Sequence, residues 1–365
     1  MLHVLGDLVA HGAELRTLEL LENLHRTGAP YEQHVITLSG REGPLAKRFR
    51  DAGVTIHVAR ARSLSFPKVF RRVLREYQVG IVHSHVDILS GYMVALARWS
   101  AVPGRIAHIR SDQLSHFSTP VGKAIGWLLR RMIDRYATSI VAVAPGTLEA
   151  AWPGARVDPR CEVILSGLAL DRFDQNVDVD AIRASLGVSA GSQLVVHLGR
   201  NVELKNRAKA IAVVRELRNQ GDYILCFVGE VDEGMTAPEG TRFIQAGIRD
   251  DVPAILASAS LTLVTSRFEG MPGAVLESLA SGTPVLSSDL PGSRFLDENL
   301  APVVIVSLQA DDDEWAGAVA RTATAVTDVP ARANRVSQMR GTQFDAATAM
   351  DRFVDLWDRS MSSRA

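Results

Sequence analysis

Short apolar runs alternate with amphipathic helical stretches through the first 143 residues of the chain. Such alternation, with short loops between the elements, indicates a parallel sheet that helices cover on both faces. In these sheets ligands bind beyond the carboxyl ends of the strands, so the loops that follow the strands are the place to look for a site. The expected strands are 2–5, 33–38, 54–58, 80–84, 105–110 and 139–143, and the expected helices are 13–26, 43–52, 66–77, 88–100 and 119–136.

The alternation stops once and then restarts. Residues 171–192 are polar and poor in strand-forming residues, which indicates a linker with one short helix. A second series of apolar runs then predicts strands over 194–198, 223–228, 261–264 and 284–286, with helices near 205–219 and from about 273. We therefore predict an α/β fold of two Rossmann-like domains that face each other across a cleft. The expected parts are an N-terminal domain over 1–168, a C-terminal domain over 169–342, and a C-terminal helix in 343–365 that packs back toward the N-terminal domain.

The composition is that of an ordinary globular protein, with 47% hydrophobic and 22% charged residues. No run approaches the ~18 apolar residues of a membrane span, and the first residues show no signal-peptide pattern. The two cysteines, Cys161 and Cys226, do not have the spacing of a metal site. These features predict a cytoplasmic protein. Lys and Arg exceed Asp and Glu in residues 1–165, and the reverse holds afterwards, which suggests that the first half meets an anionic surface or substrate. A chance distribution of charge that serves only solubility is the alternative.

The most informative segment is 266–277. It follows an apolar run, and its glycines and Pro272 allow a tight turn into a helix. A helix that begins there directs free N–H groups and the positive end of its dipole toward phosphate or sugar oxygens. Glu269 precedes the helix and Glu277 lies eight residues later, so the two carboxylates could hold two separate hydroxyl-bearing parts of one long ligand. Taken alone, they are equally compatible with a helix cap and a solvated helix residue.

Two cations follow the apolar run 194–198. Gly199 and Arg200 come directly after that run, and Lys205 and Asn206 come at the expected start of a helix. Arg and Lys together can clamp a diphosphate. A lysine at a helix N-terminus opposes the helix dipole, which points to a function for Lys205. Two ordinary surface cations are the alternative.

In their order and separation, these two segments resemble the donor-binding half of the retaining family 4 glycosyltransferases, which have the two-domain GT-B fold. The resemblance continues in 227–229, 247–252 and 282–285. Weaker matches lie in the first half, in the loop that contains Asp7 and Gly12, in the run 82–85 and in the stretch 164–173. One departure is that the glycine pair of the first loop is His11-Gly12 here.

The resemblance implies a role for each matching residue of the second half. Arg200 and Lys205 would bind the donor diphosphate and steady the leaving nucleoside diphosphate. Glu269 would hold the donor sugar, and Glu277 would hold the ribose hydroxyls. The other implied donor-binding residues are Gly12, Gly199, Asn206, Ile248, Arg249, Gly270, Met271, Pro272, Gly273 and Ala274.

In the first half, the run 105–110 is expected to place one side chain near the reacting sugar. Either His108 or Arg110 takes that place, and His108 is equally compatible with a histidine of the core. The resemblance implies that the N-terminal domain binds the acceptor and the C-terminal domain the nucleotide-sugar. The expected acceptor side comprises Asp7, His85 and Asp112. No metal and no cofactor is implied, because the nucleotide-sugar is a substrate and two cations already stand where Mg²⁺ would be.

Residues 123–136 suggest a surface function. Apolar residues recur there at helical spacing beside Lys123, Arg130, Arg131 and Arg135. Together with the basic stretch 68–75, this helix could meet an anionic membrane, which would make the protein peripheral at the inner membrane face. A core helix with a solvated face is the alternative.

We therefore expect a metal-independent, retaining glycosyltransferase of the hexosyltransferase type. Its donor would be a UDP- or GDP-sugar, and its acceptor a lipid-linked or cell-envelope glycan; no nucleic acid partner is expected. A sugar-nucleotide epimerase of the same fold and a non-catalytic nucleotide-sugar-binding subunit are the alternatives. A NAD-dependent dehydrogenase lacks support, since no Gly-x-Gly-x-x-Gly follows the first strand.

Overall fold

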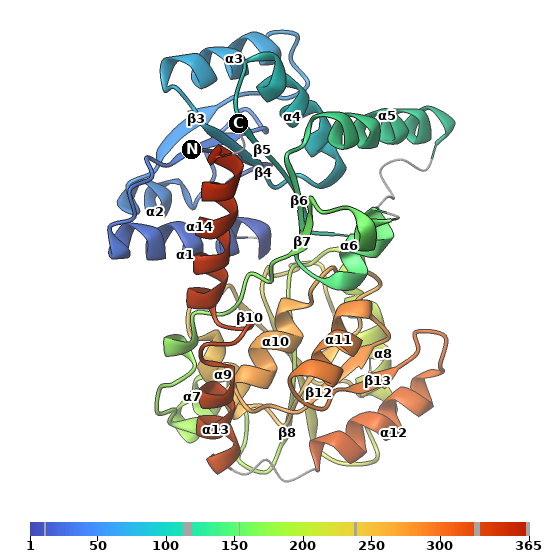
Figure 1. The fold of residues 1–365 in the computed structure, drawn as a ribbon. Helices are drawn as coiled ribbons and strands as arrows, with labels where there is room; N and C mark the ends of the chain where they lie inside the picture. Colours follow the sequence, from blue (N-terminus) through green and yellow to red (C-terminus); the bar gives the residue numbers. More distant parts are fainter. Residues whose placement is uncertain (11, 112–118, 153, 237–238, 325–328, 363–365) are drawn as a thin grey trace. The chain divides into compact units, whose positions relative to one another are not determined.

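The computed structural model describes residues 1–10, 12–111, 119–152, 154–236, 239–324 and 329–362. The chain forms two compact units, of which the first comprises Met1–Gly167 with Gln343–Ala365 and the second Leu168–Thr342. The division after Gly167 lies one residue before the boundary expected from the sequence. Each unit is built on one parallel sheet with helices around it (Figure 1). The predicted fold class, α/β with two Rossmann-like domains, is therefore confirmed.

The sheet of the first unit has seven strands in the order β3-β2-β1-β4-β5-β6-β7. The strand order reverses between β1 and β4, and sheets of this kind bind ligands at the carboxyl ends of such a pair. Every residue of β1 and β4 is buried, as expected for strands that are covered on both faces. The strands are β1 Leu2–Leu5, β2 His34–Thr37, β3 Thr55–Val58, β4 Ile81–Ser84, β5 Gly104–Ile109, β6 Ser139–Ala142 and β7 Cys161–Val163, and the helices are α1 Gly12–Thr27, α2 Ala46–Asp51, α3 Phe66–Glu76, α4 Ser90–Trp99, α5 Pro120–Tyr136 and α6 Pro145–Ala151.

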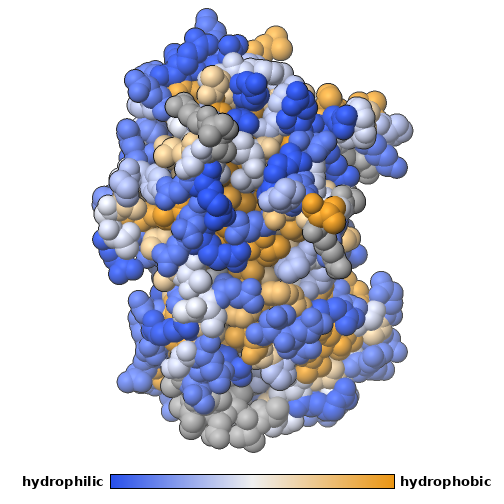
Figure 2. Space-filling view, viewed as in Figure 1, coloured by the Kyte–Doolittle hydropathy of each residue, from blue (hydrophilic) through white to orange (hydrophobic). Residues whose placement is uncertain are grey.

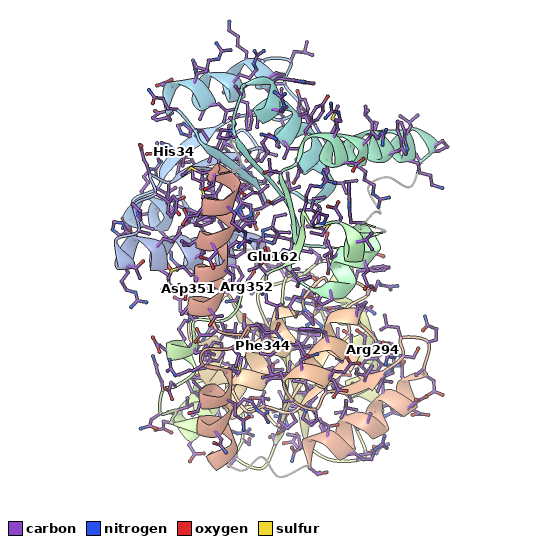
Figure 3. All side chains as sticks on the ribbon, viewed as in Figure 1. His34, Glu162, Arg294, Phe344, Asp351 and Arg352 are labelled. Atoms are coloured by element: carbon purple, nitrogen blue, oxygen red, sulfur yellow. The ribbon has the colours of Figure 1, made fainter. Side chains whose placement is uncertain are left out.

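The last helix, α14 (Ala346–Ser362), returns to the first unit and completes its core. Phe353, Leu356 and Trp357 are buried in the same apolar cluster as residues of α1 and of the central strands. Arg352, labelled in Figure 3, donates a hydrogen bond of 2.9 Å to Glu162 on β7. The C-terminal helix is therefore an integral part of this unit, although it is far from residues 1–167 in the sequence.

The sheet of the second unit has six strands in the order β10-β9-β8-β11-β12-β13, all parallel. Here the order reverses between β8 and β11, which makes the loops after these two strands the expected ligand-binding edge. No helix among the described residues is long and apolar enough to cross a membrane. The strands are β8 Gln193–Leu198, β9 Tyr223–Val228, β10 Phe243–Gly247, β11 Leu261–Val264, β12 Val285–Ser288 and β13 Val304–Val306, and the helices are α7 Val179–Ser185, α8 Arg207–Glu216, α9 Val252–Ser258, α10 Gly273–Ala280, α11 Pro291–Asn299, α12 Asp312–Ala323 and α13 Val329–Met339.

Candidate functional site

The loops after β8 and β11 are joined side by side, because their strands are neighbours in the sheet. The backbone N–H of Arg267 donates to the carbonyl of Leu204 over 2.8 Å. The hydroxyl of Thr265 lies 3.0 Å from the carbonyl oxygen of Asn206 and 3.1 Å from that of Lys205. These contacts hold the two segments singled out in the sequence against each other at the reversal of strand order.

Lys205 and Glu269 meet at this edge. The Lys205 ammonium donates to Glu269 Oε1 over 2.8 Å, and the Ser266 hydroxyl donates to the same oxygen over 2.6 Å. The two charged side chains are only 18% and 13% exposed. A cation and a carboxylate that lie 64 residues apart in the sequence are thus brought together where the fold binds ligands.

Gly199 makes room for this lysine. Its φ of +146° is unfavourable for other residues, and a Cβ at this position would lie 2.9 Å from Lys205 Cε. The lysine chain therefore packs directly over the glycine backbone at the end of β8. Asn206, the next residue after the lysine, is left-handed with φ 55° and ends the short turn before α8. Arg200 lies partly buried in the same loop.

The start of α10 faces the same edge. The N-cap residue Pro272 forms no side-chain cap hydrogen bond, and the N–H of Val275 bonds back to the Pro272 carbonyl over 3.0 Å. The positive end of the helix dipole thus lies at this edge, where it favours an anion. Glu277 turns back toward that start, and a Cβ on Gly273 would lie 3.8 Å from its Oε1. The loop over Gly270, Met271 and Pro272 is packed against α11, since a Cβ on Gly292 would come within 2.4 Å of Pro272 Cδ.

Two buried side chains that the sequence analysis did not single out support these loops. His197 on β8 lies 3.1 Å from the carbonyl oxygen of Lys205 and 3.2 Å from the Thr265 hydroxyl, and burial lowers its pKa to about 3. Arg207 donates to the carbonyls of Gly199 and Glu230, each over 2.9 Å, and its guanidinium covers the ring of Phe227. Neither residue carries a motif that could have revealed these contacts from the sequence.

The residues expected near the nucleotide base follow β10. Ile248 is 71% exposed and directly follows the last residue of the strand. Arg249 is held by Asp251 through two hydrogen bonds of 2.7 and 2.6 Å, and these bonds raise the pKa of Arg249. The arginine is therefore fixed beside its own loop, and Ile248 is the exposed apolar side chain there.

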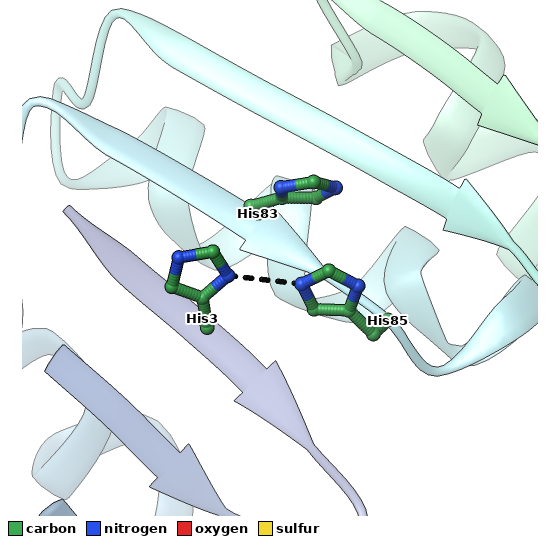
Figure 4. A group of neighbouring side chains, drawn as sticks. All are labelled: His3, His83 and His85. Atoms are coloured by element: carbon green, nitrogen blue, oxygen red, sulfur yellow. Dashed lines mark hydrogen bonds between the residues drawn. The ribbon is translucent and has the colours of Figure 1, made fainter. Parts of the chain in front are cut away.

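In the first unit, four histidines are buried together at the centre of the sheet. His3 lies on β1, His83 on β4, His85 directly after β4 and His108 on β5. Figure 4 shows His3, His83 and His85 side by side, with the hydrogen bond of 3.0 Å between His3 and His85. The donors at the ends of this group determine the tautomer of every ring.

Arg110 donates to Nδ1 of His85 over 3.0 Å, so the proton of the His85 ring is on Nε2. That nitrogen donates to Nδ1 of His3, and Nε2 of His3 in turn donates to Gln33 over 3.1 Å. In a second chain, the Trp357 indole donates to His83 over 3.2 Å, and Nε2 of His83 donates to His108 over 3.1 Å. Both chains run in one direction and contain only neutral rings.

His3, His83 and His85 also have the proximity of a metal site, since one nitrogen of each lies within 4.8 Å of the others. Burial lowers the pKa of all three, to about 3 for His3, so their rings are neutral. Their nitrogens are engaged in the hydrogen-bond chains, and the charge of Arg110 lies against His85. A cation would have to break these bonds and approach a like charge, so we interpret the group as a core network.

Arg110, and not His108, reaches the carboxyl end of β5. His108 is completely buried inside the sheet, whereas Arg110 follows the strand and bonds to Thr17 over 3.2 Å. Burial lowers the pKa of Arg110 to about 10, while the carboxylates of Glu14 and Asp87 oppose the shift. The structure thus brings Arg110 to the ligand-binding edge of the first sheet.

The remaining residues expected in the first unit have different surroundings. Asp7 follows β1 and forms an ion pair with Arg41 over 2.9 Å. His85 is buried and belongs to the histidine chain. Gly12 begins α1, and a Cβ there would meet no atom within 4 Å. Asp112 lies outside the described residues.

Comparison with known proteins decides the family. A family model described as "Glycosyl transferases group 1" matches residues 192–324, and one described as "Glycosyl transferase 4-like domain" matches residues 11–165. The chain belongs to the group 1 glycosyltransferases. The two matches contain the two parallel sheets almost completely, so the glycosyltransferase fold extends over both units.

This group 1 glycosyltransferase is similar to several curated and solved proteins. It is 24% identical to the capsular polysaccharide biosynthesis glycosyltransferase CapH of Staphylococcus aureus, over 80% of this chain and 81% of CapH. It is 23% identical to the UDP-Gal:alpha-D-GlcNAc-diphosphoundecaprenol alpha-1,3-galactosyltransferase of Escherichia coli, over 94% and 96% of the two chains. The structure of Anabaena HepE in complex with UDP-glucose matches with a TM-score of 0.80 and 16% identity, over 98% and 99% of the chains, and shows that the fold is GT-B.

Proposed function

We propose that this glycosyltransferase transfers a sugar, with retention of configuration, from a UDP- or GDP-sugar to a lipid-linked or cell-envelope glycan. The observation that carries the proposal is the Lys205–Glu269 pair at the reversal of strand order, beside the start of α10. The names of CapH and of the Escherichia coli galactosyltransferase support an envelope or lipid-linked acceptor. The UDP-glucose complex of HepE favours UDP over GDP.

The donor would occupy this edge from end to end. Arg200 and Lys205 contact the diphosphate, together with the N–H groups from Gly270 to Ala274. Glu277 holds the ribose hydroxyls, and Glu269 holds hydroxyls of the sugar. As the glycosidic bond breaks, negative charge grows on the leaving phosphate, and the two cations stabilise it. The leaving phosphate itself takes the proton of the acceptor hydroxyl.

In the free protein Lys205 and Glu269 neutralise each other over 2.8 Å. A diphosphate is a stronger partner for a cation than a single carboxylate, since it carries more charge. On donor binding, Lys205 therefore exchanges Glu269 for phosphate, and the released carboxylate accepts from the sugar. The pair keeps both groups in position without leaving a largely buried charge unpaired.

We further propose that no metal ion takes part. In metal-dependent transferases a divalent cation neutralises the diphosphate, and here Arg200, Lys205 and the α10 dipole supply positive charge at that place. The nucleotide-sugar is a substrate, so the reaction requires no cofactor.

Donor binding tests the proposal without knowledge of the acceptor. A set of UDP- and GDP-sugars is screened for an increase in melting temperature, because a ligand that binds the folded state stabilises it. One UDP-sugar should stabilise the wild type, and Arg200→Ala and Lys205→Ala should abolish the effect. In a turnover assay each variant should lose about 10²-fold.

Lys47→Ala is the matched control, since that lysine is exposed on α2 of the other unit. It should respond to the donor as the wild type does. If neither Arg200→Ala nor Lys205→Ala changes the response to any nucleotide-sugar, the donor site is elsewhere and the proposal is wrong.

We also propose that α5 places the enzyme on an anionic membrane. The helix buries Gly126, Leu129 and Ile133, but leaves other apolar residues at the surface, where Figure 2 shows hydrophobic residues over α5. Lys123, Arg131 and Arg135 are also exposed on this helix. Exposed apolar residues among cations suit an anionic lipid surface. The exposed apolar residues are Val121 at 71%, Trp127 at 67%, and Ile125 and Leu128 at 47% each.

Flotation with lipid vesicles tests this placement. The protein should float with vesicles rich in phosphatidylglycerol and stay behind with pure phosphatidylcholine. Trp127→Glu should prevent flotation. Val157→Glu is the control and should not, because Val157 is an exposed apolar residue that lies outside α5. Equal behaviour of the two variants would remove the support for α5 as a membrane contact.

A further inference from the structure

The second unit contains a cavity that shares only Asn206 with the residues expected to bind the donor. It has a volume of about 470 Å³, which is within the range of small-molecule sites. Its walls come from the loops after β8, β11 and β13 and from α8, so it opens at the ligand-binding edge of the sheet. The lining residues are Asn206, Lys209, Arg267, Phe268, Leu308 and Gln309.

The polar groups of this cavity favour an anion. Arg267 is exposed, and its guanidinium forms no ion pair with any residue in the described parts of the chain. Lys209 is already balanced, since it donates to Asp312 over 2.8 Å and to the carbonyl of Ala310 over 2.9 Å. One positive charge, that of Arg267, is therefore left for a ligand.

The other groups favour a sugar. Phe268 is 55% exposed, so its ring offers an apolar face to a sugar ring. Gln309 lines the cavity and accepts from Ser307 over 2.7 Å through its amide oxygen, so its amide nitrogen is left as a donor. The Asn206 side chain forms no hydrogen bond within the described ranges, and its amide can both donate and accept. Planar amides beside an exposed ring match the hydroxyls and the apolar face of a carbohydrate.

We propose that this cavity binds an anionic sugar residue. Its carboxylate or phosphate pairs with Arg267, its ring lies over Phe268, and its hydroxyls contact Asn206 and Gln309. The role that we assign to the cavity is to hold an acidic residue of the acceptor glycan beyond the sugar that reacts. Only this role rests on the proposed function.

The cavity adjoins the donor site through the backbone. Asn206 directly follows Lys205, and Phe268 directly precedes Glu269. The same two loops that carry the ion pair thus form one wall of the cavity. A glycan bound there would be held next to the reacting centre, with the charge of Arg267 selecting acidic chains.

Ligand-detected NMR saturation transfer tests the inference, with UDP at a saturating concentration to occupy the donor site. Trigalacturonate should give signals, and neutral maltotriose should bind at least several-fold more weakly. Arg267→Gln should lower the affinity for trigalacturonate about tenfold, because a hydrogen-bonded charge partner is lost. Phe268→Ala should weaken both trisaccharides.

Arg242→Gln is the matched control. Arg242 is also exposed, but it pairs with Asp222 at the amino end of β10, away from the cavity. Its substitution should leave binding unchanged. Glucose 6-phosphate, tested in parallel, shows whether a phosphate serves as well as a carboxylate, and binding of either anion that depends on Arg267 supports the inference.

Equal binding of trigalacturonate and maltotriose, or an Arg267→Gln variant that binds as the wild type does, would overturn it. Calorimetric titration of UDP alone is the separate measure of the donor site. If UDP fails to bind while trigalacturonate binds as expected, the proposed function is wrong and the cavity remains an anionic sugar site.

Discussion

The two glutamates should respond in opposite ways to the loss of their charge. In Glu269→Gln the side chain still accepts from Ser266, but the ion pair with Lys205 is lost. Hydrogen bonds to charged groups contribute about 1.5–3 kcal/mol, and Lys205 no longer has to give up this one to bind a diphosphate. The affinity for UDP should therefore stay the same or increase, by up to about tenfold. The kcat should fall about 10²-fold, because the carboxylate that faces the growing positive charge on the sugar is gone.

Glu277→Gln removes a contact to the ribose, which does not change during the reaction. The affinity for UDP should fall about tenfold or more, and KM for the donor should rise with a smaller effect on kcat. Calorimetric titration of UDP and steady-state kinetics on both variants measure the difference. Glu314→Gln, in the first turn of α12, serves as the control. A Glu269→Gln variant that loses as much UDP affinity as Glu277→Gln would refute the exchange of partners at Lys205.

Three further outcomes are expected. Activity should persist in excess EDTA, and loss of activity with rescue by Mg²⁺ or Mn²⁺ would show that a metal bridges the diphosphate. Gly292→Ala should weaken UDP binding and lower the free energy of unfolding in urea by about 1–3 kcal/mol, since its Cβ would clash with Pro272. Gly191→Ala is the control and should change neither UDP binding nor stability, because a Cβ there meets no atom within 4 Å. His3 and His197 have pKa values of about 3 against 6.5 in the unfolded chain, so the unfolded state takes up protons first as the pH falls. Stability should be constant above pH 6.5 with respect to these groups and decrease below it, by about 1.4 kcal/mol for each at pH 5.5; equal urea midpoints at pH 7.5 and 5.5 would contradict their neutral state.

The strands that the sequence did not predict are all at sheet edges. They are β7 at one edge of the first sheet, and β10 and β13 at the two edges of the second. An edge strand has one neighbour and partial contact with the covering helices, so it does not need a continuous apolar run. None of the residues of β7 or β10 is fully buried, in contrast to all residues of β9 and β11. Apolar runs and apolar periodicity in a sequence reflect burial of the side chains, and the residues of these edge strands are little buried.

The charged members of the proposed donor site could be singled out from the sequence because they lie in two segments whose order and separation resemble those of a known family. The sequence indicated that Lys205 and Glu269 act on the same ligand, but not that they pair with each other. The sequence could not indicate the residues that support these loops. His197 has the pattern of an ordinary strand residue, and Gly292 comes close to Pro272 only because α11 packs on the loop. Contacts of this kind depend on tertiary structure and leave no local pattern.

The choice between His108 and Arg110 shows the same limit. Both residues lie in the apolar run 105–110, and residues two apart on a strand point to the same face. The sequence pattern therefore does not distinguish them. What separates them is the position at which the strand ends, with β5 finishing at Ile109. His108 remains inside the sheet as a partner of His83, and Arg110 emerges at its edge.

The return of α14 to the first unit has a consequence for how the protein is made. Phe353 and Trp357 complete a core that otherwise consists of residues before Gly167, so on the ribosome this unit lacks part of its interior until the last helix has emerged. The unit Leu168–Thr342 is continuous and can fold as soon as it leaves the exit tunnel. The N-terminal half, although synthesised first, is thus expected to reach its native state last, with the apolar surface meant for α14 exposed to chaperones in the meantime.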